Sequence, residues 1–552
     1  MLKERVQQAI AEALGSTEFT LLYPRDKAFG DFAINIHQLK KLALNEQALV
    51  EKLSLLDIFE KVELVQGFVN MRVAYTEYLA ELNAALRGGT QPAAPNPHAQ
   101  RINLEFGQPN THKLPHIGHL FSYAYGESMA RLLAWDGHTV FRSNYQGDVG
   151  LHVAKCLYIF MQRKDDAKNL STLEDKVRFL QTCYQDGSAA YDENSNAKTA
   201  IDAINKAIYN RDDTIHAVWE ETRSWSVAYY KKFEERIGTT YDRYFFESET
   251  SDLGTKLVQE HIDSVFTESD GAVVFKGEQF GLHTRVFLTT HGTPTYEAKD
   301  IGLIALKKQE WPFDTAVITT ASEQNAYWQV VKKAIELIFP ELQGKIMHIG
   351  FGMIDLKGSK MSSRTGNIVS AIDLIEIVKK KCARELVKKW QPRGCRNNSH
   401  WGRKICLFKN LKQKKNMIFD LEQSISVQGN SGPYLQYTYA RLRSVLAKAQ
   451  YEPSALQNST TSETLSSEDY AILRMLPTFS DVAHQAAVAY SPHLLCTYVY
   501  DLAQACNLLY DKQSILKAPQ AQRELRLALL EAASRTIKTS LNLLGIDVLE
   551  RI

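Results

Sequence analysis

The stretch from residue 101 to residue 145 constrains the fold more than any other part of the chain. RINLEF at 101–106 alternates like a strand, residues 115–138 have the pattern of a helix, and TVFRSNY at 139–145 has that of a second strand. A strand, a helix and a strand at this spacing predict a parallel βαβ unit. Strand patterns return later, at residues 272–277, 284–290, 315–321 and 345–352. We therefore expect an α/β domain with a doubly wound, Rossmann-like parallel sheet.

At 552 residues, the chain is too long for one hydrophobic core. A charged helical stretch from residue 158 to about 245 separates the strand patterns and predicts an insertion between the halves of the sheet. The expected parts are an α+β N-terminal domain at 1–88, a Gly-, Pro- and Ala-rich linker at 89–99, the α/β domain at 100–378 with its insertion at about 158–285, and an all-α helical bundle at 379–552.

The net charge bears on possible nucleic-acid partners, and the cysteine usage bears on the cellular compartment. Sixty-five basic and 63 acidic residues leave a net charge of +2, which neither requires nor excludes a nucleic-acid partner. The first helix pattern contains Glu4 and Glu12, unlike a signal or transit peptide, and no run of eighteen apolar residues predicts a membrane span. The seven cysteines form no CxxC pair, so we expect free thiols and a cytoplasmic protein.

The stretch PNTHKLPHIGHL at 109–120 holds three histidines directly after the first strand. His116 and His119 could face one side of a helix and bind a metal, but no nearby Cys or Glu completes a zinc site. Plain packing is a second interpretation. In a third, the histidines and the helix N-terminus bind phosphate, since free N–H groups and the helix dipole favour anions there. Gly118 would then let a nucleotide approach the backbone.

A second phosphate-suited element supports the third interpretation. GSKMSSRTGN at 358–367 offers a lysine and two hydroxyls after the strand pattern at 345–352. Taken alone it would be a solvated surface turn. Both elements follow strands of one doubly wound sheet, so both belong at the carboxyl edge, where such folds bind ligands.

HIGH together with KMSS resembles the class I aminoacyl-tRNA synthetases, and the surrounding residues resemble the arginyl-tRNA synthetases in particular. The similarity covers nearly the whole chain and includes INLEFGQPN, NYQGDVG, GTPTYEAKDIG, NSGPYLQYTYAR and the N-terminal GDFAIN. It implies ligation of L-arginine to tRNA(Arg) through arginyl-adenylate, with ATP and Mg²⁺ as a co-substrate complex, no structural metal, and a monomer. It also implies that the N-terminal domain binds the tRNA elbow and that the helical domain binds the anticodon.

The resemblance also assigns residues to roles. The arginine pocket falls on Glu105, Asn110, His116, Tyr296, Asp300 and Gln324. ATP binding falls on His116, Gly118, His119, Lys360, Met361, Ser362 and Ser363, with His116, His119, Lys113 and Lys360 as the catalytic set. Stacking on anticodon bases falls on Tyr434, Tyr437 and Tyr439, with Arg441 beside them. No role falls on His112, which we expect to be solvent-exposed.

Elementary chemistry supports the arginine pocket independently, because a carboxylate meets the planar, always charged guanidinium bidentately. The sequence departs from the common KMSK loop, since Ser363 replaces the second lysine. Many arginyl enzymes that lack a loop lysine carry one just before HIGH, and Lys113 matches that position. Lys113 and Lys360 are therefore the candidates for holding the triphosphate from two sides.

One segment departs from the family pattern. Residues 388–415 contain ten Lys or Arg and no acidic residue. This could be a basic patch for tRNA phosphates, a helix of unusual composition, or the product of a compensated frameshift over about 394–408. Two alternative functions also stay open: a small HxGH nucleotidyltransferase, which would leave about 170 C-terminal residues unexplained, and a non-catalytic RNA-binding paralogue.

Overall fold

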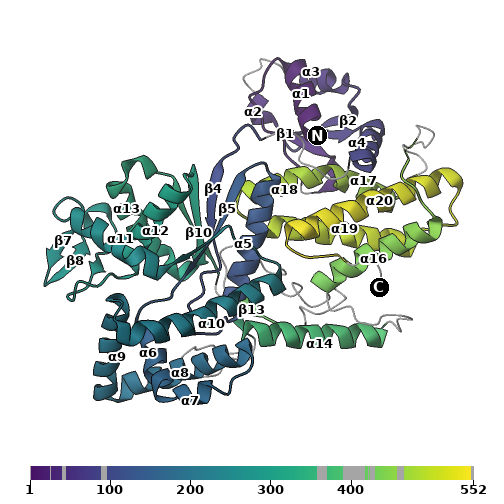
Figure 1. Cartoon of the computed structure of the whole chain (residues 1–552). Helices are drawn as coiled ribbons and strands as arrows, with labels where there is room; N and C mark the ends of the chain where they lie inside the picture. The colour runs from purple at the N-terminus through teal and green to yellow at the C-terminus, as the bar shows by residue number, and fades with distance from the viewer. Residues whose placement is uncertain are drawn as a thin grey trace. The chain divides into compact units, whose positions relative to one another are not determined.

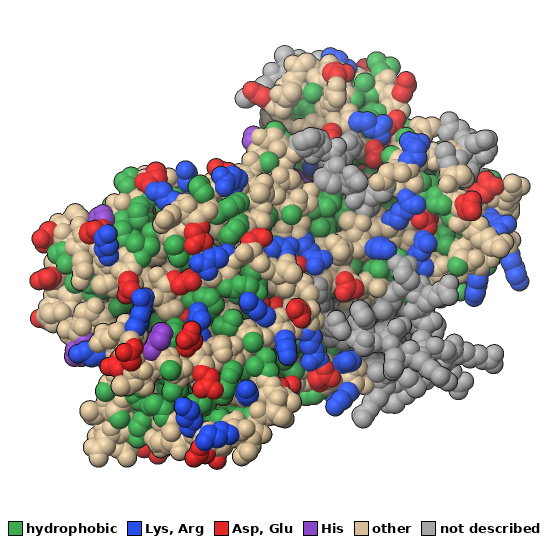
Figure 2. Space-filling view, viewed as in Figure 1, with side chains coloured by type: hydrophobic (Ala, Val, Ile, Leu, Met, Phe, Trp, Pro, Cys, Tyr) green, Lys and Arg blue, Asp and Glu red, His purple; other side chains and the backbone are tan. Residues whose placement is uncertain are grey.

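The computed structural model describes residues 2–24, 26–39, 45–88, 96–352, 354–356, 370–389, 417–420, 422, 429, 431–454, 456 and 465–548. Its contacts divide the chain into two compact units. One unit comprises Met1–Pro95, Pro433–Ala489 and Leu494–Ile552, and the other comprises Asn96–Gly432 and Tyr490–His493. Among the described residues, no helix is long and apolar enough to cross a membrane. Basic and acidic side chains are interspersed over the described surface that Figure 2 shows.

The second unit is built on a five-stranded sheet in the order β11-β10-β4-β5-β6 (Figure 1). Every neighbouring pair in it is parallel. The strands are β4 (Arg101–Glu105), β5 (Thr139–Gln146), β6 (Arg243–Phe246), β10 (Thr315–Ala321) and β11 (Ile346–Phe351). Ile102 and Leu104 of β4 and Ala316, Val317 and Ile318 of β10 are all 0% exposed, as expected for strands covered on both faces. The predicted Rossmann-like parallel sheet is confirmed.

Helices follow the strands and position the polar residues at the carboxyl edge. α5 (Ile117–Trp135) connects β4 to β5, and α12 (Tyr296–Glu310) and α13 (Asn325–Ile338) flank β10. α11 (Glu247–Glu260) packs closely against α12, because a Cβ on Gly302 would lie 2.3 Å from the Thr250 carbonyl oxygen. Only glycine permits this backbone approach, so α11 and α12 are held at a fixed distance.

Two expectations need correction, one about the insertion and one about the later strand patterns. β6 lies within 158–285 yet pairs with β5, so the expected insertion contains a strand of the central sheet. The patterns at 272–277 and 284–290 form β8 (Ala272–Phe275) and β9 (Arg285–Leu288) of a separate antiparallel sheet with β7 (Thr267–Ser269). The helices before β6 are α6 (Leu151–Gln162), α7 (Lys164–Ala167), α8 (Leu173–Glu193), α9 (Ser195–Tyr209) and α10 (Asp213–Ile237). Later in this unit, α14 (Ala371–Lys389) follows β12 (Ile354–Leu356), which pairs with β13 (Met417–Phe419).

The first unit joins the two ends of the chain. Its antiparallel sheet has the order β1-β3-β2, formed by β1 (Phe32–Asn35), β2 (Phe59–Val65) and β3 (Phe68–Val73). The N-terminal helices are α1 (Leu2–Leu14), α2 (Ile36–Leu39), α3 (Glu46–Ser54) and α4 (Tyr75–Gly88). The C-terminal helices are α16 (Gly432–Ala449), α17 (Ser467–Met475), α18 (Phe479–Val488), α19 (His493–Lys512) and α20 (Gln520–Leu543). Arg474 forms an ion pair with Asp31, and Arg535 donates to the Leu86 carbonyl at 2.8 Å, so the N-terminal part packs on the bundle.

Candidate active site

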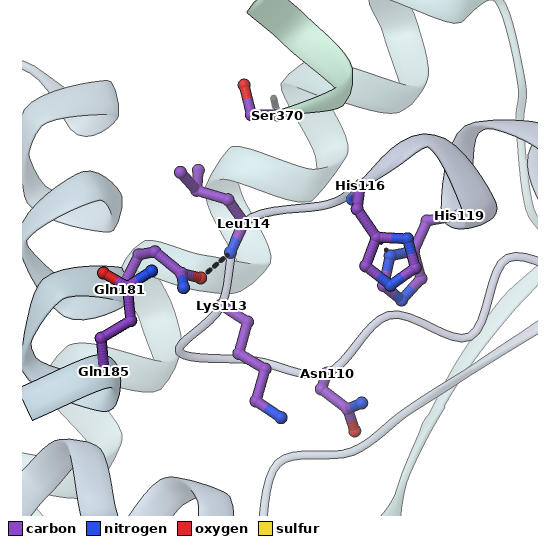
Figure 3. Close-up of a pocket in the computed structure, with 8 residues that line it drawn as sticks. All are labelled: Asn110, Lys113, Leu114, His116, His119, Gln181, Gln185 and Ser370. Carbon is purple, nitrogen blue, oxygen red and sulfur yellow. Dashed lines mark hydrogen bonds between the residues drawn. The ribbon is translucent and has the colours of Figure 1, made fainter. Parts of the chain in front are cut away.

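A cavity of about 220 Å³ lies where β4 ends and α5 begins (Figure 3). Its lining consists of Asn110, Lys113, Leu114, His116, His119, Gln181, Gln185 and Ser370. Four predicted site residues therefore lie together: Asn110, Lys113, His116 and His119. The lining offers one ammonium group, imidazoles, amides and a hydroxyl but no carboxylate, which suits an anionic ligand.

The two HIGH histidines cap the helix that carries them. His116 is the N-cap of α5, and its Nδ1 accepts the Gly118 N–H at 3.1 Å. The His116 N–H in turn donates to His119 Nδ1 at 3.2 Å, and the two ring centroids lie 3.9 Å apart. A Cβ on Gly118 would lie 2.9 Å from His116 Cε1, so the glycine first makes room for this ring. The donors expected to be free for phosphate are thus occupied by the motif itself.

Both histidines are neutral near pH 7. Burial and the nearby Lys113 ammonium lower the pKa of His116 to about 4. Burial, His116 and Lys113 hold the pKa of His119 well below its usual value. Neutral imidazoles can still donate a hydrogen bond to a phosphate oxygen, and among the described lining residues the positive charge resides on Lys113.

Helix α8 forms the wall of the cavity opposite His116 and His119 (Figure 3). Gln181 Oε1 accepts the Leu114 N–H at 2.9 Å, which fixes the loop between β4 and α5 (Figure 3). Lys113 Nζ lies 4.2 Å from the centroid of the Tyr184 ring, which holds the ammonium group by a cation–π contact. Sequence reasoning missed Gln181, Tyr184 and Gln185, since nothing in their local pattern distinguishes them from other residues of a charged helix.

The expectation that His112 is solvent-exposed is wrong. His112 is 0% exposed, and its two ring nitrogens share hydrogen bonds of 2.8 Å with the hydroxyls of Thr111 and Thr222. Burial and the positive charge of Arg223 lower its pKa to about 3. Its backbone φ of 63° is in the left-handed region, held by a 3.0 Å bond from its N–H to Ser226 Oγ. His112 therefore anchors the loop to α10.

Buried acidic residues gather beside this cavity. Glu105 ends β4 and is fully buried, and Asp300 lies on α12 and is 8% exposed. The Tyr327 hydroxyl donates to Asp300 Oδ2 at 2.5 Å. Burial raises the pKa of Asp300 well above its usual value, the Tyr327 bond opposes this, and the Glu105 and Glu247 carboxylates add to it. A buried carboxylate of this kind favours a cationic ligand.

Two buried lysines of α12 were not predicted as site residues. Lys307 forms an ion pair with Glu105, and Lys299 forms one with Glu247. Lys299 Nζ also lies 4.4 Å from the centroid of Tyr296, whose side chain is 57% exposed. Lysine is normally assigned to solvent. The sequence offered one sign that Lys307 belongs to the site, its position two helical turns after Asp300.

Asn110, which lines the cavity, also lies next to one of the buried acidic residues, Glu247. A Cβ on Gly147 would lie 2.2 Å from Asn110 Oδ1 and 3.3 Å from Glu247 Oε1, so the two side chains flank the same point of the backbone. Gln324 is exposed just before α13 and makes no side-chain hydrogen bond within the part of the chain that the structure describes. Gln324 lies just past the carboxyl end of β10, and its place in the arginine pocket stays a prediction.

Several predicted residues lie outside the described residues. These are Lys360, Met361, Ser362 and Ser363, together with the segment 394–408. The residues expected to stack on anticodon bases lie on α16. Tyr439 is 2% exposed and belongs to the bundle core, so its expected stacking role is wrong. Tyr434 and Tyr437 are partly exposed, and Arg441 pairs with Asp511 at 3.2 Å and lies over the Tyr510 ring.

Comparison with known proteins accounts for this geometry. The family described as tRNA synthetases class I (R), catalytic domain, matches residues 81–399, which is more than half of the chain. The chain belongs to the arginyl-tRNA synthetases of class I. The arginyl tRNA synthetase N-terminal domain matches residues 1–73, and the DALR anticodon-binding domain matches residues 435–552. The anticodon-binding match accounts for the C-terminal region that a small nucleotidyltransferase would leave unexplained.

Individual arginyl-tRNA synthetases match over similar lengths. An arginine–tRNA ligase of Phocaeicola vulgatus is 28% identical and aligns over 88% of this chain and 87% of its own length. One from Clostridium perfringens is 26% identical and aligns over 100% and 99%. The Thermus thermophilus arginyl-tRNA synthetase structure shares the fold, with a TM-score of 0.81 at 23% identity and complete coverage of both chains.

Proposed function

We propose that this arginyl-tRNA synthetase ligates L-arginine to tRNA(Arg) in two steps, with ATP as co-substrate and arginyl-adenylate as intermediate. The observation that carries the proposal is that Asn110, which lines the cavity, and the buried carboxylate of Glu247 flank the same point of the backbone at Gly147, so that two sites of opposite character adjoin there. The first is the cavity lined by Lys113 and the imidazoles, which suits phosphates. The second is the group of buried carboxylates that contains Glu247 and Asp300, in which Asp300 suits a guanidinium.

In the first step, the arginine carboxylate attacks the α-phosphorus of ATP and pyrophosphate leaves. Lys113 attracts the phosphates, and His116 and His119 donate hydrogen bonds as negative charge builds on the phosphoryl oxygens. The reaction requires no protein nucleophile, so catalysis consists of positioning and charge stabilisation. Lys360 in the KMSS loop is proposed to hold the triphosphate from the other side.

Magnesium is proposed to enter with ATP. Among the described residues, no carboxylate lines the cavity and no cluster of three His, Cys, Asp or Glu side chains could hold a metal ion. Hard cations prefer oxygen ligands, which the triphosphate itself supplies. When bound, the ion neutralises phosphate charge, and the protein contributes Lys113 on the same phosphates.

In the second step, a ribose hydroxyl of the terminal adenosine of tRNA(Arg) takes the arginyl group and AMP leaves. The helices between β5 and β6 are proposed to contact the acceptor end, because Gln181 and Gln185 of α8 line the cavity. Tyr434 and Tyr437 are the remaining candidates for stacking on anticodon bases. The N-terminal domain is proposed to bind the tRNA elbow, and the enzyme to act as a cytoplasmic monomer.

Amino acid selection is proposed to rest on charge. A wrong amino acid would leave the Asp300 carboxylate buried without a cation, which penalises misactivation without an editing site. Detectable hydrolysis of mischarged tRNA by the purified enzyme would contradict this part of the proposal.

ATP–pyrophosphate exchange with each amino acid, with and without tRNA, tests the function. We expect exchange with arginine alone, and only when tRNA(Arg) is present. Exchange with another amino acid would overturn the assignment, and no exchange in any combination would favour a non-catalytic RNA-binding role.

A further inference from the structure

Glu105, one of the two acids expected to bind the substrate guanidinium, is already engaged. Its Oε2 pairs with the Lys307 ammonium group, and its Oε1 accepts a 2.6 Å hydrogen bond from Gln108 Nε2. Lys307 is 0% exposed, so no water screens the pair. Each carboxylate oxygen therefore already has one partner before any substrate arrives.

The neighbouring acids are also paired. Glu247 pairs with Lys299, Asp148 pairs with Arg223 at 2.6 Å, and Glu297 pairs with Arg285 at 3.0 Å. Asp300 differs from all of them. Within the described residues, its side chain receives one hydrogen bond, from the neutral Tyr327 hydroxyl, and forms no ion pair.

When Asp300 is ionised, as arginine binding requires, the charges of this buried cluster do not balance. Each of the other acids has its own cation, so one carboxylate is left without one, that of Asp300. A guanidinium carries one positive charge, which matches this single deficit. If Lys307 were neutral, the cluster would lack two cations, and one arginine could compensate only one of them.

We propose that Lys307 is a positioning residue of the amino acid pocket, which holds Glu105 and balances its charge so that Asp300 supplies the one uncompensated negative charge for the guanidinium. This inference rests on the proposed function, since it takes arginine as the substrate. Lys307 acts through Glu105 and does not touch the substrate. The buried lysine thus sets the number of positive charges that the pocket accepts.

The groups around Asp300 determine how loss of Lys307 changes the pKa of Asp300. Tyr327 faces it from α13, Glu105 from β4, Glu247 from α11 and Tyr145 from β5, while Lys299 lies on α12 itself. Arginine binds the ionised form of Asp300. Removing a nearby positive charge raises the pKa of a carboxyl group. The variant therefore needs a higher pH to bind arginine.

The test is the KM for arginine in tRNA aminoacylation, measured from pH 6 to pH 9 for the wild type and Lys307→Met. Lys307 is seven residues, about 10 Å, along the helix from Asp300, so we expect the profile to shift by about one pH unit and KM to rise about tenfold at the acidic end. The difference should shrink toward pH 9, and the KM for ATP should stay unchanged. A structural defect would raise KM by the same factor at every pH.

Two further variants keep the test decisive if Lys307→Met folds poorly. The double variant Glu105→Gln/Lys307→Met restores the charge count, and its arginine profile should return to the wild-type pH range. Lys308→Met is the matched control, because Lys308 is the next residue and forms an exposed pair with Glu341. It should leave the profile in place.

A Lys307→Met profile that coincides with the wild type, or a double variant that stays shifted, would overturn the inference while arginine charging by the wild type stands. Failure of the wild type to charge arginine would instead overturn the proposed function.

Discussion

Replacement of Asp300 by Asn removes the charge but keeps the shape of the side chain. The amide oxygen of the variant would still accept the hydrogen bond from Tyr327, which is 2.5 Å long in the wild type, so the packing of α12 against α13 is preserved. Removing one partner of a buried, hydrogen-bonded charge pair costs about 2 to 5 kcal/mol. We take about 3 kcal/mol for Asp300→Asn, because the neutral amide can still accept from the guanidinium, and this corresponds to a rise in KM on the order of 150-fold.

Aminoacylation kinetics separate this effect from a general defect. The KM for arginine should rise while the KM for ATP changes little, and the melting temperature should stay at or above that of the wild type. Because burial raises the pKa of Asp300 in the free enzyme, arginine binding releases a proton and arginine affinity increases with pH until Asp300 is ionised. The Asp300→Asn variant should lack this dependence.

Three results would refute the reasoning: a rise of less than about fivefold in the arginine KM, an equal rise in the ATP KM, or an unchanged pH dependence of arginine binding in Asp300→Asn. The first would mean that another acid, such as Glu105, carries the guanidinium. Glu105→Gln measured in parallel would then show the larger loss.

Three further predictions concern the scaffold around the site. The pKa of His112 is about 3, below its unfolded value of 6.5. The free energy of unfolding should therefore fall by up to about 1.4 kcal/mol per pH unit from this group as pH drops below 6.5. In denaturation experiments, His112→Gln should lose stability less steeply over the same pH range. Gly302→Ala should lower the melting temperature, because its Cβ would lie 2.3 Å from a backbone carbonyl and overpacking costs about 1 to 3 kcal/mol. Gln181→Met removes the acceptor of the Leu114 N–H and should raise the KM for ATP about fivefold, from about 1 kcal/mol.

The sequence predicts the central sheet because its strands have strong local patterns. β10 spans Thr315–Ala321, as expected from TAVITTA, and β5 extends the expected strand by one residue. β6 escaped prediction because RYFF is only four residues long and follows a 25-residue charged helix. Its place in the sheet is decided by pairing with β5, which no local pattern encodes.

The same distinction between local pattern and tertiary contact applies to the candidate site. The loop that holds Asn110, Lys113, His116 and His119 is continuous in sequence, so its residues could be found together. Residues such as Gln181 and Lys307 reach the site through tertiary contacts alone. His112 was misjudged for a related reason, because its burial depends on Thr222 and Ser226 of a helix more than a hundred residues away.

The self-capped start of α5 has a consequence for how ATP is used. In the resting enzyme, the Gly118 and His116 N–H groups are already satisfied by the two imidazoles. A phosphate that enters must exchange these bonds for its own, so ground-state ATP gains little net hydrogen bonding at this position. Hydrogen bonds from these donors become stronger only when negative charge accumulates on the phosphoryl oxygens. An interaction that strengthens at that stage accelerates the reaction without tightening substrate binding. On the proposed mechanism, the bonds within the histidine cap would be exchanged for bonds to phosphate, so that they would stabilise the transition state more than bound ATP.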